Sequence, residues 1–252
     1  MSNFSQKLLV TLIAILIVFS GLWYLNREWA KQDPARIEVD PEVELRVWQL
    51  LEQSKTATYF ECAAILSDIH AMGYQTIPVL LEALNNDDPR TRAFAANALQ
   101  HSDNLYVIPH LQARLSDSNA TVRRAALGAL GTMQAVEALP AVILVLDDKD
   151  NFTRCQAALV LGSLGQEAAV APLTETLRND PYPVARQTAA NSLGKIGSKE
   201  AVPALIDSLQ DTDYLVRSAS LSALNEITNA RLGPNRDDWT RWWNLTQGRL
   251  SN

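Results

Sequence analysis

The stretch AVPALIDSLQDTDYLVRSASLSAL, from Ala201 to Leu224, contains the pattern on which the fold of this chain depends. Its first half opens on Val-Pro, where proline in the first turn of a helix costs no hydrogen bond, and then carries apolar residues at helical spacing. Asp211 follows in a polar turn, and the second half carries a stripe of small and apolar residues. The stretch therefore predicts two short helices joined by an Asp-containing turn.

This unit recurs along the chain with a nearly fixed period. The prolines that open each first helix and the arginines that begin each second helix are both separated by 31, 31, 32 and 31 residues. The prolines are Pro78, Pro109, Pro140, Pro172 and Pro203, and the arginines are Arg92, Arg123, Arg154, Arg186 and Arg217. Because two residue types keep one period, the chain contains an internal repeat.

The repeat determines the fold class. A single pair of helices cannot bury its apolar face alone, so neighbouring pairs must stack into a continuous core. A degenerate pair, residues 42–55 and 56–72, precedes the regular copies. We therefore expect an all-α, right-handed α-solenoid of about six helical hairpins over residues 41–230, following one transmembrane helix.

The repeats resemble the short HEAT-like repeats named after phycobilisome lyases. Ala201 to Leu224 is the best copy, and NSLGKIG, from Asn191 to Gly197, ends the copy before it. The resemblance covers Ile77 to Thr228 and implies the solenoid fold. It says little about function, since this fold serves many unrelated roles.

An apolar segment lies near the N-terminus. Leu8 to Leu25 contains 18 residues without an ionisable side chain. As a helix it would be about 27 Å long, close to the roughly 30 Å of a bilayer core. We interpret residues 1–31 as a short tail and a signal-anchor helix, and residues 32–40 as a linker. A signal peptide cleaved after Val18-Phe19-Ser20 is the alternative.

The charge distribution bears on location and partners. The formal net charge is −6, and only the two ends of the chain carry a basic surplus. A nucleic-acid groove needs a basic surface, so we exclude nucleic acid as a partner. We expect a single-pass protein of the inner (cytoplasmic) membrane that contacts the lipid bilayer through residues 8–25. Bacterial anchors of this form commonly export the rest of the chain, which favours a periplasmic repeat domain.

The last segment, residues 231–252, is rich in tryptophan. Trp239, Trp242 and Trp243 would share one face of a helix beginning at Asp237 or Asp238. The segment from Ile227 to Trp243 is similar to a closing segment of many bacterial HEAT-repeat proteins. We interpret it as a cap on the last hairpin, which terminal repeats need. An aromatic docking surface is the alternative.

Few residues suggest catalysis. The histidines are His70, His101 and His110, and none precedes Glu, unlike the His-Glu steps of deoxyhypusine hydroxylase, which also has HEAT-like repeats. Cys62 and Cys155 lie three hairpins apart, roughly 30 Å at about 10 Å per packed helix, which is too far for a disulfide. We therefore expect no enzyme activity, no metal and no cofactor.

The periodic charged residues have two interpretations. They could form an anion-binding ladder, or each arginine could be held by the Asp turns of its own and neighbouring units. Because the aspartates keep the register of the arginines, we favour the structural role. This structural ladder consists of Arg92, Arg123, Arg154, Arg186, Arg217, Asp117, Asp148, Asp180 and Asp211.

Partner recognition then falls to the second helices, which usually line the concave side of a solenoid. Positions one and five after each arginine should face outward. The resulting row is Asn97, Arg124, Cys155, Leu159, Gln187, Asn191, Ser218 and Ser222, together with Ala93 and Gly128. Small and neutral side chains suit a peptide or helix of a protein partner in a membrane or envelope complex. A scaffold is therefore the predicted function, and a bilin lyase or its chaperone subunit, which the family resemblance implies, is the alternative.

Overall fold

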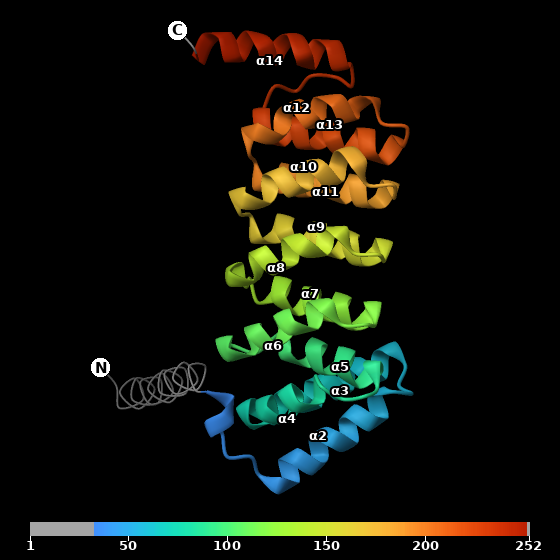
Figure 1. The fold of residues 1–252 in the computed structure, drawn as a ribbon, viewed down its shortest axis with the longest axis vertical. Coiled ribbons are helices and arrows are strands. Elements are labelled where there is room, and N and C mark those ends of the chain that lie inside the picture. The colour runs from blue at the N-terminus through green and yellow to red at the C-terminus, as the bar shows by residue number, and fades with distance from the viewer. Residues whose placement is uncertain (1–32, 251–252) are drawn as a thin grey trace, which may run out of the picture.

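The computed structural model describes residues 33–250, which form an elongated stack of thirteen α-helices and several single 3-10 turns (Figure 1). The first helices of the hairpins, here called A helices, are α2 (Pro41–Ser54), α4 (Thr76–Ala83), α6 (Ile108–Ala113), α8 (Leu139–Leu144), α10 (Val170–Asn179) and α12 (Val202–Asp207). The second, or B, helices are α3 (Tyr59–Ala71), α5 (Pro89–Leu99), α7 (Ala120–Thr132), α9 (Asn151–Leu164), α11 (Pro183–Ile196) and α13 (Tyr214–Thr228). Helix α14 (Arg236–Leu250) follows at the C-terminal end of the stack.

The all-α solenoid predicted from the repeat is confirmed. Within residues 33–250, no helix is both long enough and apolar enough to cross a bilayer. The expected membrane span, residues 8–25, lies outside the described residues. The linker residues nearest the solenoid include a 3-10 turn, η1 (Pro34–Arg36), whose Pro34 is buried.

The periodic aspartates Asp117, Asp148, Asp180 and Asp211 do not cap the B helices directly. Asp148 Oδ1 instead accepts the backbone N–H of Asp150, at 2.8 Å. Asp150 is the N-cap, and its carboxylate accepts from the N–H of Thr153, also at 2.8 Å. The periodic aspartate therefore stabilises the turn before the helix, and the residue two positions after it is the N-cap.

Two B helices end at a glycine in the left-handed conformation. Gly165 and Gly197 follow α9 and α11 with φ of 64° and 78°. This left-handed conformation is the cap for which glycine is suited.

The B helices pack closely because small residues lie between them. Ala126, Ala157 and Ala189 are fully buried. A Cβ placed on Gly162 of α9 would lie 2.8 Å from the Cα of Ser192 on α11. From α5 onward, successive B helices therefore contact one another extensively, whereas successive A helices, most of which are shorter, contact less. The B helices α7, α9, α11 and α13 also line the hollow described below, which marks their side as the inner, concave one.

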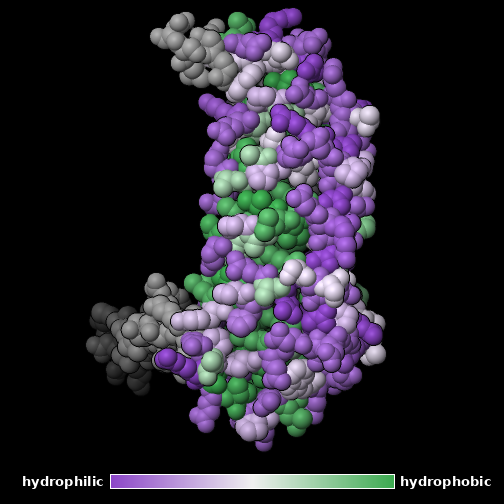
Figure 2. All heavy atoms as spheres, in the orientation of Figure 1, coloured by the Kyte–Doolittle hydropathy of each residue, from purple (hydrophilic) through white to green (hydrophobic). Residues whose placement is uncertain are grey.

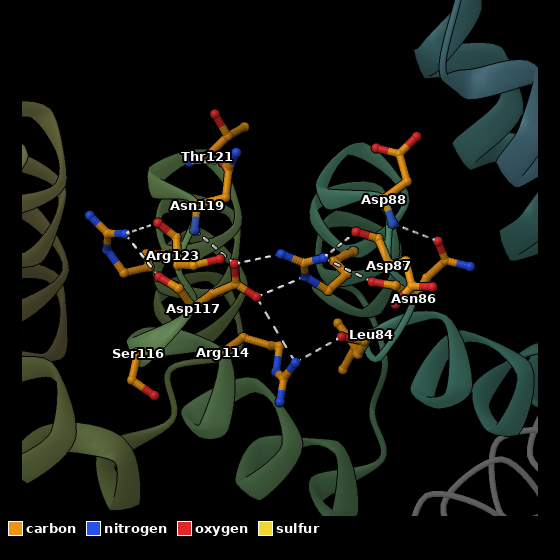
Figure 3. A network of polar contacts seen from close by, with 12 residues as sticks. Leu84, Asn86, Asp87, Asp88, Arg114, Ser116, Asp117, Asn119, Thr121 and Arg123 are labelled. Carbon is orange, nitrogen blue, oxygen red and sulfur yellow. Dashed lines mark hydrogen bonds and ion pairs between the residues drawn. The ribbon is translucent and has the colours of Figure 1, made fainter.

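Arginine–aspartate pairs connect successive repeats (Figure 3). Arg123 donates from Nε and Nη2 to the two carboxylate oxygens of Asp148 in the next repeat, each at 2.6 Å. Its Nη1 donates to the backbone carbonyl of Asp117 in its own turn, at 2.9 Å. Three equivalent steps are made by the pairs Arg92–Asp117, Arg154–Asp180 and Arg186–Asp211. Each of these arginines thus connects the turn of its own repeat to the turn of the next repeat.

The ladder is largely shielded from water. Arg154 and Asp180 are each only 8% exposed. The hydrogen bond from Arg186 lowers the pKa of Asp211, outweighing the opposite effect of burial. The ladder ends at Arg217, which donates to the carbonyls of Asp211 and Thr212 and has no aspartate ahead of it among the described residues.

The C-terminal helix covers the last hairpin. Helix α14 contacts α12, and Trp239 is fully buried between them and the preceding loop. The indole N–H of Trp239 donates to the carbonyl of Gly233 at 2.8 Å, and Arg236 pairs with Asp207 at 2.7 Å. This is the packing expected of a cap, with Trp242 and Trp243 only partly buried.

The close approach of α9 and α11 makes Gly162 sensitive to substitution. We expect Gly162→Ala to lower the free energy of unfolding by about 1–3 kcal/mol, because the added methyl group would force the helix backbones apart. Gly128→Ala is the control, since its Cβ would meet only Gln156, at 4.0 Å. The control should be neutral or stabilising by up to about 1 kcal/mol. Urea denaturation followed by circular dichroism measures both, and equal effects would contradict close packing at Gly162.

The ladder predicts unequal effects of removing its arginines. Arg154→Ala leaves the buried Asp180 carboxylate without its charge partner and should cost about 3–5 kcal/mol. Arg217→Ala removes a comparable side chain that bonds only to carbonyls in its own turn, and should cost about 1–2 kcal/mol. The two midpoints of urea unfolding test this difference. A loss at Arg217 as large as that at Arg154 would show that the inter-repeat pair has no special role.

Candidate functional site

A hollow of about 710 Å³ opens on the concave side of the stack, where α7, α9, α11 and α13 face solvent. Helices α9 and α11 contribute equally to its lining, and the residues of α9 are Phe152, Cys155, Gln156 and Leu159. Figure 2 shows that hydrophobic side chains gather between polar ones along the middle of one face of the stack. The hollow, here called the concave hollow, is the candidate site.

The structure brings together half of the concave row predicted from the sequence. Arg124, Cys155, Leu159 and Asn191 all line the concave hollow. The remaining four lie outside its lining: Asn97, on α5, and Gln187 are half-buried, and Ser218 and Ser222 are exposed. Gly128 is half-buried beside it on α7.

Ala93 was wrongly placed in this row. It is 6% exposed and belongs to the hydrophobic core. Helix α5 neighbours the degenerate first hairpin, so the register that exposes this position in later repeats buries it here.

A row of exposed apolar residues on α9, α11 and α13 was missed, and its first member lines the concave hollow. Phe152, Val184 and Leu215 each lie two residues before the periodic arginine, and all three are exposed, Phe152 by 61%. The ring of Phe152 contacts the ring of Tyr182 edge-on, with centroids 5.9 Å apart. Counting backwards from the arginines would have found this row. The sequence reasoning counted only forwards.

The electrostatics of the concave hollow are nearly balanced. Arg124 is paired with Asp150 at 2.9 Å, so its charge is largely compensated. Lys195 and Glu226 line the hollow with opposite charges, and Glu226 accepts a hydrogen bond from Ser222 at 3.2 Å. An apolar row, amide side chains and little net charge suit a segment of polypeptide rather than a polyanion.

Cys155 is not set up as a nucleophile. Burial raises the pKa of its thiol, the negative charge of Asp180 raises it further, and Arg154 opposes these effects only in part. The thiol therefore stays protonated near neutral pH, and no histidine lines the concave hollow to accept its proton. Cys62 is half-buried on α3, with its Sγ facing the carbonyl of Ala57 at 3.9 Å.

Two of the histidines meet at a smaller hollow of about 330 Å³ between α3 and α5. The rings of His70 and His101 pack edge-on with centroids 5.5 Å apart, and His70 Nε2 donates to the carbonyl of Ala98 at 2.9 Å. Within residues 33–250, no group of three or more His, Cys, Asp or Glu side chains is arranged to hold a metal ion.

Solved structures with a similar fold are engineered proteins and natural solenoids. Two crystal structures of engineered proteins are each 18% identical to this chain, with TM-scores of 0.54 and 0.53; they cover 75% and 77% of this chain and 98% and 95% of their own. The complex of CpcE and CpcF of phycocyanin lyase from Nostoc sp. is 21% identical, with a TM-score of 0.40, covering 90% of this chain and 86% of that chain. At these identities the likeness concerns the fold alone.

Family assignment rests on the sequence profile of the repeats. No curated protein matched the chain. The profile of HEAT repeats matches residues 108–194 and 171–234, which together span half of the chain and include the helices that line the concave hollow. The chain belongs to the HEAT-repeat family.

Proposed function

We propose that this protein is a membrane-anchored scaffold that binds a segment of a protein partner in its concave hollow and catalyses no reaction on it. HEAT repeats support protein binding in general. The finer assignment, to this surface and to a membrane complex, is the proposal.

The exposed apolar row, whose Phe152 lines the concave hollow, carries the proposal. Phe152, Val184 and Leu215 come from three successive repeats, and each is more than 40% exposed. Successive helices in such a stack lie about 8–10 Å apart, so the row offers regularly spaced apolar contacts. Gln156 and Asn191 in the lining can donate to and accept from a bound backbone. Apolar anchors surrounded by polar groups are typical of protein interfaces.

Bilin lyase or chaperone activity is the alternative function. It follows from the kind of repeat, but the structural likeness to phycocyanin lyase has a TM-score of only 0.40 and supports no inference about activity. A protonated Cys155 and a balanced charge also provide no reactive group in the concave hollow. The scaffold is therefore the better-supported function.

The proposed location depends on residues 8–25. Their length and lack of charge suit a bilayer span, and residues 32–40 would hold the solenoid near the membrane surface. We propose the periplasmic side of the inner membrane for the repeats.

Site-specific photocrosslinking tests the binding surface. A photoreactive amino acid at Leu159, on the concave side of α9, should give a discrete crosslinked protein in intact membranes. The same group at Leu144, the exposed last residue of α8 in the same repeat, is the matched control. Adding Phe152→Asp should remove the Leu159 crosslink by placing a charge in the apolar row. Equal adducts at both leucines, or none at Leu159, would contradict the proposal.

Membrane fractionation tests the anchor separately. The full chain should remain in the membrane pellet after alkaline carbonate extraction, because about 18 apolar residues insert stably into a bilayer. A chain lacking residues 1–31 should be released into the supernatant. If the full chain is extracted as readily as the shortened one, the anchor proposal is wrong, whereas the crosslinking result stands on its own.

A further inference from the structure

A second groove, outside the concave hollow, lies between α2 and α3 at the N-terminal end of the stack. Its volume is about 450 Å³. The buried side chains of Leu50 and Ile65 form its floor, and Ala57 and Ala64 leave room above them. We call it the N-terminal groove.

The helix on one side of this groove exposes unusually large apolar side chains. Tyr59 and Phe60, in the first turn of α3, are 84% and 83% exposed, and their rings pack edge-on with centroids 5.8 Å apart. Phe60 lies one turn before Ala64, so its ring stands beside the groove. Helix α3 is the first B helix of the described residues, and no earlier repeat there covers its outer face. Its apolar residues are thus available to a partner.

The groove is also acidic. Glu61 and Asp68 line it from α3, seven residues apart, and no Lys or Arg lines it. The nearby Lys55 is committed to Glu52 and Asp88. The whole segment from residue 32 to 76 contains three basic and eight acidic residues, a balance of −5.

We propose that the N-terminal groove binds a basic amphipathic helix of another protein. The apolar face of such a helix would cover Leu50, Ile65 and Phe60, and its Lys or Arg side chains would meet Glu61 and Asp68. Seven residues of helix rise about 10.5 Å, so partner cations at i and i+7 match the two carboxylates. The same negative charge repels nucleic acid and an anionic bilayer, which leaves a basic polypeptide as the complementary ligand.

This inference is independent of the concave hollow. The N-terminal groove shares no lining residue with it, and the two involve different helices. A scaffold with two such surfaces would hold two segments at once.

A designed peptide provides the test. The full chain, in nanodiscs of neutral phosphatidylcholine, is titrated into a fluorescent 18-residue helical peptide of leucine and lysine, with empty nanodiscs as the blank. A peptide with glutamate in place of lysine is the matched probe. We expect the basic peptide to bind at low salt, the acidic peptide not to bind, and 0.5 M NaCl to weaken the complex.

Variants locate the binding. Glu61→Gln with Asp68→Asn should weaken binding by about tenfold, because two charge contacts are lost. Glutamine can still accept the N–H of Thr58, so the capping box of α3 is kept. Phe60→Ser should weaken binding through lost apolar contact. Glu137→Gln, an exposed carboxylate far along the stack, and Leu159→Glu in the concave hollow should leave it unchanged.

Three results would overturn the proposal. These are no binding of the basic peptide, equal binding of the acidic peptide, and binding that survives both groove variants. Leu159→Glu is measured in the same assay and alters only the concave hollow. A failure of the groove proposal is therefore distinguishable from a failure of the proposal that the concave hollow binds a partner.

Discussion

The interaction on which this structure depends is the bond between the arginine of one repeat and the aspartate of the next. Each such guanidinium forms two parallel hydrogen bonds to the following turn and a third to its own turn, as Arg154 does with Asp180 and with the carbonyl of Asp148. Two-pronged pairing of this kind fixes direction as well as distance. Buried ion pairs add little net stability compared with apolar packing, but breaking one is costly. The ladder therefore sets the register in which the apolar faces stack.

The concave surface follows from that register. With the turns aligned, B helices approach so closely that Gly162 has no room for a side chain against Ser192. The lining of the concave hollow then combines apolar and amide side chains with a few opposite charges, and the ladder pairs do not line it. A surface of this kind can bind polypeptide without carrying a reactive group. The ends differ, since α14 covers the C-terminal end with Trp239, while α3 leaves aromatic residues exposed.

The sequence predicted the fold well because its repeat period has a structural cause. Proline, arginine and aspartate recur at fixed spacing, and each has one place in a stacked helical pair. The pairing of Arg123 with Asp148 was foreseeable from their shared register, although which residue caps α9 was not. Asp148 and Asp150 are both good capping residues, and only the backbone path distinguishes them.

The candidate site was predicted only in part, because the repeat period does not describe the irregular first hairpin. Counting from the arginines identifies the outward-facing positions of regular repeats, and two residues found in this way, Leu159 and Asn191, line the concave hollow. Ala93 was misplaced because α5 packs against an irregular hairpin, whose geometry no period describes. The N-terminal groove could not be foreseen, since it depends on how far α2 and α3 diverge rather than on any repeated residue.

A double-mutant cycle at Arg154 and Asp180 tests the central claim most directly. The free energy of unfolding is measured by urea denaturation for the full chain, for each alanine variant and for the double variant. Removing both partners should cost much less than the sum of the single losses, with a coupling energy of at least about 1.5 kcal/mol. Additivity within about 0.5 kcal/mol would show that the two side chains do not depend on one another, and that the ladder does not hold the repeats in register.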